Sequence, residues 1–117
     1  MSRALRISEL RAAWWAHRCL RHARRGLAAR TTEVGIAPPA LPARAVRGVE
    51  AILRRRRATC LEAAIVRQQW LLAHGVMRDV VIGVTSPKDG FTAHAWLAVP
   101  GEIAPSEPWH ELTRWAA

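Results

Sequence analysis

Cys60 is the residue of this 117-residue sequence whose context most favours chemistry. Thr59 precedes it and Glu62 follows, which is the spacing of a capping box, where a hydroxyl and a carboxylate satisfy the free amides of a helix start. The pattern therefore predicts a helix with Cys60 on its first turn. The free amides and the helix dipole favour an anion there, so the thiol should ionise easily, and the thiolate is the nucleophilic form.

His94 supplies a second reactive group. It lies within residues 91–99, an apolar segment that predicts a strand in which Thr92, His94, Trp96 and Ala98 share one face. A thiol at a helix start and an imidazole on the sheet packed against that helix suit a thiol hydrolase: the thiolate attacks a carbonyl and the imidazolium protonates the leaving amine. Each residue also has a simpler interpretation, because a lone cysteine or histidine is more often a packed core residue.

Helical periodicity organises the first half of the chain. Residues 7–27 contain no proline and predict a helix that Ser8 could cap, with one basic side. The expected apolar side consists of Leu10, Ala13, Trp14 and Leu20. Prolines in residues 35–42 end this helix, and a second helix is expected from Pro42. Its apolar stripe consists of Val46, Val49 and Leu53.

The second half mixes helix and strand. The helix from Cys60 should end at Gly75, a good residue for the left-handed position after a helix. Residues 79–84 predict a strand covered on both faces, and the turn at 86–90 should join it antiparallel to the strand at 91–99. A short strand at 102–104 and a helical turn at 106–115 are expected to follow. The fold class is therefore α+β.

Composition indicates one domain whose basic charge implies an acidic partner, either nucleic acid, an acidic protein or an acidic peptide. Half of the residues are hydrophobic and six are tryptophan, enough for a core, and the net charge is +9 with Lys88 as the single lysine. We expect a basic helical part at 1–57 and a catalytic core at 58–117. The arginine run at 54–57 either attracts an acidic substrate and favours the thiolate or is a solvated helix end.

Location and cofactors follow from the same composition. No run of 18 apolar residues and no signal peptide are visible, which predicts a cytoplasmic protein without a membrane span. A reducing cytosol argues against a Cys19–Cys60 disulfide, so we expect Cys19 to be an ordinary thiol. No cofactor is indicated, and the remaining histidines lack the spacing of a metal site. These are His17, His22, His74 and His110.

Four short motifs carry a family resemblance. They are Cys60-Leu61-Glu62-Ala63-Ala64, Leu71-Leu72-Ala73-His74-Gly75, Val81-Ile82-Gly83-Val84 and His94-Ala95-Trp96-Leu97. In this order they resemble the transglutaminase-like core of the lasso-peptide B2 leader peptidases, a papain-like cysteine protease arrangement, over residues 59–101. The short basic half before Cys60 also resembles a B2 protein that acts beside a separate leader-binding protein, B1.

The resemblance implies a reaction and its residues. The lasso precursor peptide would be cut between leader and core, and a separate ATP-dependent cyclase, a further candidate partner, would close the core. Cys60 would be the nucleophile and His94 the acid/base. The family has an acid about a dozen residues after the histidine, where this chain has Ser106. Glu107 is the preferred substitute and Glu102 the second choice.

The sequence is compatible with alternatives for two details of the site and with two other functions. Trp96 either lines the substrate groove or packs in the core. The Cys60 amide would form part of the oxyanion hole, whose second donor is not identified. A small basic nucleic-acid-binding protein would explain the arginines, although no nucleic-acid motif is present. A transglutaminase-like acyl transferase would use the same thiol to pass the acyl group to an amine.

Overall fold

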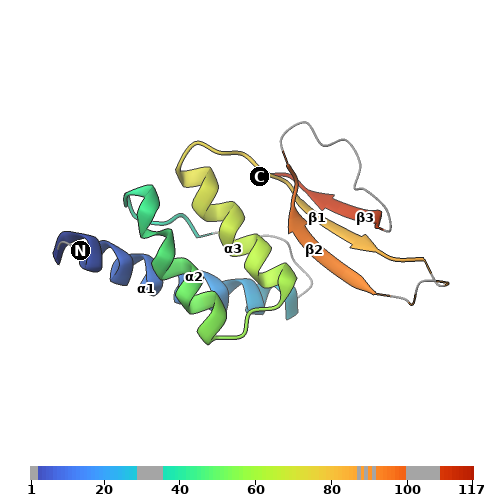
Figure 1. Ribbon diagram of the computed structural model, residues 1–117, viewed down its shortest axis with the longest axis horizontal. Coiled ribbons are helices and arrows are strands. Elements are labelled where there is room, and N and C mark those ends of the chain that lie inside the picture. Colours follow the sequence, from blue (N-terminus) through green and yellow to red (C-terminus); the bar gives the residue numbers. More distant parts are fainter. Residues whose placement is uncertain (1–2, 29–35, 87, 89, 91, 100–108) are drawn as a thin grey trace.

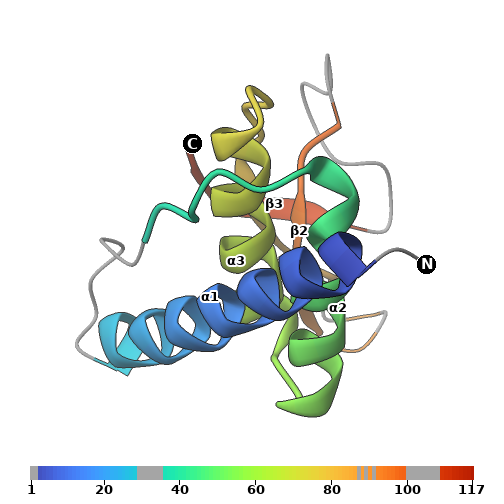
Figure 2. The same ribbon diagram turned by 90° about the vertical axis from the view of Figure 1, so that its left-hand side faces the viewer.

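In the computed structural model, three helices precede a small antiparallel sheet along the chain. The structure describes residues 3–28, 36–86, 88, 90, 92–99 and 109–117. The helices are α1 (Arg3–Ala28), α2 (Val46–Arg55) and α3 (Cys60–Ala73), and the 3-10 turn η1 (Ala43–Ala45) leads into α2. The strands are β1 (Val80–Val84), β2 (Ala93–Leu97) and β3 (His110–Trp115), in the order β2-β1-β3. α3 lies between the α1–α2 pair and the sheet (Figure 1). Figure 2 shows α1 crossing in front of α3, with the sheet behind.

The buried face of α1 differs from the expected one. Leu20 is buried as predicted, but Leu10 and Trp14 are 69% and 66% exposed, so the predicted apolar side is wrong at these two positions. The buried hydrophobic residues among the described side chains of α1 are Ala12, Trp15, Ala16, Cys19, Leu20 and Ala23. Most of them are small, which allows α1 to approach α2 and α3 closely. None of the helices within the described ranges is long and apolar enough to cross a membrane.

Gly48 shows how close the approach of α1 and α2 is. A Cβ atom at this position would lie 2.0 Å from the carbonyl oxygen of Glu9 and 3.0 Å from the amide nitrogen of Ala13. Both atoms belong to the backbone of α1, so they could move only if the helices separated. The expected stripe of α2 is confirmed beside this crossing, since Val49 and Leu53 are buried and Val46 packs against the same core.

Local interactions define both ends of α3. The Glu62 amide donates to the Thr59 hydroxyl at 3.2 Å, and the Thr59 amide donates to the Glu62 carboxylate at 3.0 Å, which completes the capping box. Such a cap stabilises a helix by about 1 kcal/mol. At the other end Gly75 has φ +79°, and the amides of Gly75 and Val76 donate back to the carbonyls of Leu72 and Leu71. The predicted end of this helix is therefore confirmed.

The sheet confirms the predicted hairpin and corrects the C-terminal element. β1 is the central strand and pairs antiparallel with β2, so that Val81 faces Trp96 and Gly83 faces His94. Residues 110–115 form β3 on the other edge of β1, whereas a helical turn was expected over 106–115. Pairing with the free edge of a buried strand satisfies a row of main-chain groups that an isolated helical turn would leave open. The short strand expected at 102–104 lies outside the described residues.

Candidate active site

The Cys60 thiol is exposed at the first residue of α3 and forms no disulfide. The capping box of Thr59 and Glu62 places it there, and Arg24 of α1 adds an ion pair to Glu62 at 3.2 Å. The Arg24 guanidinium also donates to the Arg56 carbonyl at 2.9 Å, just before the helix begins. The start of α3 is therefore connected to α1 through one arginine, which limits movement of the thiol.

The Cys60 sulfur lies against the main chain of β2. The amide of Ala95 donates to the sulfur, with 3.4 Å between nitrogen and Sγ. β2 is an edge of the described sheet, so the outward amide of Ala95 has no strand partner and is available to the sulfur. Ala95 directly follows His94 in the strand, so the thiol lies one residue from the imidazole-bearing position.

The His94 ring is held by two indoles. Its centroid lies 5.8 Å from that of Trp96, in a stacked arrangement, and 5.5 Å from that of Trp109. The Trp96 indole packs directly over Gly83, because a Cβ atom added at Gly83 would lie 2.5 Å from the Trp96 ring. Cys60 and His94 are both described, and no hydrogen bond between the thiol and the imidazole is present in this structure. The ring is exposed.

Three contributions to this site were not anticipated from the sequence. The Ala95 amide contacts the sulfur, Trp109 contacts His94, and Gly83 gives Trp96 its place. The glycine had a usable signal, because a glycine inside a strand often marks the close approach of another group. No sequence signal pointed to Trp109, because its position beside His94 depends on the pairing of β3 with β1. Trp96 is half-buried within this aromatic cluster.

A basic cavity of about 420 Å³ lies beside the start of α3. It is lined by His17, Leu20, Arg21, Arg24, Arg25 and Arg56, which come from α1 and from the turn between α2 and α3. The pKa of His17 is lowered, first by desolvation and then by the charges of Arg56 and Arg21. Arg57, in the same turn, has φ +51°. Arginines from two parts of the chain therefore form one concave cationic surface, which Arg24 connects to Glu62 in the first turn of α3.

Cys19 is fully buried, as a structural thiol would be. Burial raises its pKa from an ordinary 9.0 to about 11, and the backbone of Ile36 offsets part of this shift. It is therefore protonated at neutral pH. Among the described side chains no group of three histidine, cysteine or carboxylate residues could hold a metal ion. Glu107 and Glu102, the two candidate acids, lie outside the described residues.

Comparison with known families places nearly the whole described chain in one superfamily. The sequence model of the transglutaminase-like superfamily matches residues 3–116. The match includes α1 and β3 and so extends well beyond the 59–101 stretch that carries the motifs. Neither a curated protein nor a solved structure matches the chain.

Proposed function

Since the chain belongs to the transglutaminase-like superfamily, we propose that it is a cysteine peptidase that removes the leader from a lasso precursor peptide, with B1 delivering the leader. The observation that carries the proposal is the contact of the Cys60 sulfur with the amide of Ala95, the residue after His94. An exposed thiol at a helix start, beside a histidine on an adjacent strand, is the pairing that thiol hydrolases use.

The reaction would proceed through a thioester. The Cys60 thiolate attacks the carbonyl carbon of the scissile bond, and the Cys60 amide, free of an intrahelical acceptor, donates to the resulting oxyanion. The His94 imidazolium protonates the leaving nitrogen as the C–N bond breaks, which releases the core peptide. The neutral imidazole then takes a proton from water, and the hydroxide attacks the thioester to release the leader acid and the thiol.

Catalysis in this scheme requires His94 to approach the thiol. Trp96 and Trp109 hold the ring in the resting protein, where it makes no hydrogen bond to Cys60. Catalytic hydrogen bonds often form only when substrate binds. Stacking energies of about 1 kcal/mol are small enough for substrate binding to replace them. We therefore propose that substrate binding brings His94 to the sulfur.

The acid that orients His94 is proposed to be Glu107, with Glu102 as the alternative. A carboxylate on one ring nitrogen selects the tautomer and stabilises the imidazolium, so its isosteric amide should lower turnover while substrate binding is retained. Single-turnover cleavage by Glu107→Gln and Glu102→Gln identifies which carboxylate acts. Loss in Glu102→Gln alone would reverse the assignment.

The basic cavity beside α3 is proposed to attract the acidic parts of the leader or of B1. Four arginines line it, so long-range attraction should raise the association rate and weaken as salt increases. Tight binding of duplex DNA at physiological salt, unaffected by changes to Cys60 or His94, would instead favour the nucleic-acid function.

The decisive experiment is precursor cleavage by Cys60→Ala in the presence of B1, followed by mass spectrometry. The variant should lose at least about a thousandfold in rate, because the nucleophile is absent. Cys19→Ala is the matched control and should cleave at nearly the wild-type rate. Cleavage by Cys60→Ala would refute the proposal, and transfer of the leader acyl group to an added amine would identify an acyl transferase.

A further inference from the structure

α1 carries a second row of apolar side chains that faces away from the core. Ile7, Leu10 and Trp14 are 53%, 69% and 66% exposed, and they recur at i, i+3 and i+7. This spacing places them on one stripe of the helix. Single exposed apolar residues are ordinary, but a continuous row of large ones marks an interaction surface. The helix therefore presents one apolar stripe to its own core and another to solvent.

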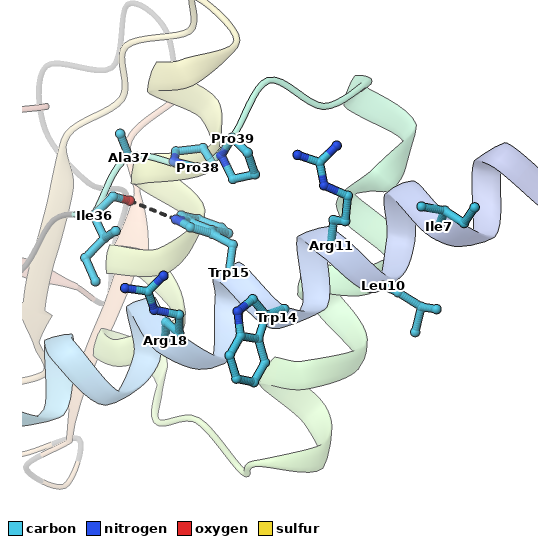
Figure 3. Close-up of a pocket in the computed structure, with 10 residues that line it drawn as sticks. All are labelled: Ile7, Leu10, Arg11, Trp14, Trp15, Arg18, Ile36, Ala37, Pro38 and Pro39. Carbon is cyan, nitrogen blue, oxygen red and sulfur yellow. Dashed lines mark hydrogen bonds between the residues drawn. The ribbon is translucent and has the colours of Figure 1, made fainter.

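This row borders a groove of about 620 Å³. The segment Ile36–Pro39 forms the facing wall, and the Trp15 indole holds it in place by donating to the Ile36 carbonyl at 2.9 Å (Figure 3). Trp15 is buried in the main core, so the wall is anchored to the rigid part of the protein. Pro38 and Pro39 add apolar surface without main-chain donors. The α1 groove, as we call it, is thus preformed.

Charge and dimensions define what the α1 groove would bind. Arg11 and Arg18 line it seven residues apart and reach from α1 toward the Ile36–Pro39 segment, whereas Leu10 and Trp14 lie on the outer side of the helix (Figure 3). No carboxylate is among the described lining residues. From Ile7 to Arg18 the helix rises about 16 Å, the length of about three turns of a packed helix. An apolar row beside a basic row matches an amphipathic helix with acidic residues along one side.

We propose that the α1 groove docks an acidic amphipathic helix of B1, an inference that rests on the function proposed above. Apolar side chains of that helix pack on Leu10 and Trp14, and its carboxylates pair with Arg11 and Arg18. Tryptophan and arginine are the residue types that most often dominate binding energy at protein interfaces.

The α1 groove lies away from the thiol. Figure 1 shows the first turns of α1 at the end of the molecule opposite the sheet, whereas the Cys60 sulfur contacts β2. A protein bound to the α1 groove therefore leaves the candidate active site open to the peptide that it delivers. Holding the leader nearby raises the effective concentration of the scissile bond without a change in the chemistry.

The test measures binding of purified B1 by calorimetry, with every protein carrying Cys60→Ala so that no turnover occurs. Trp14→Glu should raise the dissociation constant at least about 30-fold, because a charge replaces a central apolar anchor. Arg11→Gln and Arg18→Gln should each raise it about threefold to tenfold and reduce its dependence on salt. Met77→Glu is the matched control, because Met77 is 72% exposed but lies in the connection between α3 and β1. This variant should bind B1 as tightly as the protein that carries Cys60→Ala alone.

Several outcomes would overturn the inference. The first is that B1 does not bind at all. The second is that B1 binds the Trp14→Glu variant as tightly as the protein with Cys60→Ala alone. The third is that Met77→Glu weakens B1 binding as much as Trp14→Glu does. Sedimentation that shows a dimer of this chain, converted to a monomer by Trp14→Glu, would assign the α1 groove to a second copy. Circular dichroism verifies that each variant is folded. Because binding is measured without catalysis, B1 binding that ignores Trp14 refutes the docking site alone, whereas cleavage by Cys60→Ala refutes the peptidase alone.

Discussion

Cys19 and Cys60 carry the same side chain in opposite surroundings. Cys19 lies fully buried on α1 within the core formed by all three helices, and burial raises its pKa to about 11. Cys60 is exposed at the start of α3, with its sulfur against the Ala95 amide of an edge strand. The helical core excludes water from the Cys19 thiol, whereas Cys60, at the junction of helix and sheet, is open to solvent. Position within the fold, rather than residue type, separates a buried thiol from an exposed one.

The largest expected difference between the two thiols is in alkylation. With iodoacetamide at neutral pH, Cys60 should react at least about a thousandfold faster than Cys19, which becomes accessible only when the helical core opens. Peptide mapping by mass spectrometry measures both rates in one sample. Comparable rates would show that α1 detaches from α2 and α3 without global unfolding.

Gly48→Ala should lower the stability of the helical core around Cys19 more than it disturbs the region around Cys60. The new methyl group would lie 2.0 Å from the Glu9 carbonyl oxygen, a backbone atom, so α1 and α2 must separate. We expect the free energy of unfolding to fall by about 3 kcal/mol, as in overpacked cores. Urea unfolding measures this change, and alkylation of Cys19 should accelerate far more than that of Cys60. An unchanged or higher stability would mean that the crossing of the two helices is looser than described.

The Cys19 thiol should make stability sensitive to alkaline pH. Its pKa is raised from 9.0 to about 11, so the folded protein keeps this proton at pH values where the unfolded chain has lost it. The resulting stabilisation is fully present below about pH 9 and is lost as pH rises through about 11, by about 2 to 3 kcal/mol relative to Cys19→Ala. Urea unfolding of both proteins across this range measures the difference. Parallel pH profiles would contradict the burial of the thiol.

Gly83→Ala should have the smallest effect of the four predicted here. It acts on the sheet beside Cys60 and His94 rather than on the helical core around Cys19. The added methyl group would lie 2.5 Å from the Trp96 indole, which can shift, so stability should change little. Displacing Trp96 disturbs the ring stacked on it, that of His94, and we expect about a tenfold lower turnover number with a nearly unchanged KM. A second change, Trp96→Phe, should restore part of the activity by relieving the contact. If the double variant is no better, Gly83 does not act through Trp96.

Elements defined by neighbouring residues were predictable from the sequence. The capping pair of Thr59 and Glu62 and the glycine at position 75 set the two ends of α3 through contacts within a few residues of each other. The β1–β2 hairpin follows from two β-branched or apolar runs around a short turn. Cys60 and His94 could therefore be singled out before any tertiary contact was known.

Only the tertiary structure decided which surfaces meet. α1 has two apolar stripes, and the tight crossing at Gly48 selects the one rich in small residues, which leaves Leu10 and Trp14 exposed. Residues 110–115 form a strand because the free edge of β1 offers main-chain partners that no local pattern reveals. The same return of the chain brings Trp109 to His94. Capping and turn formation depend on sequence neighbours, whereas the choice between competing surfaces depends on residues distant in the chain, and a local pattern does not contain that information.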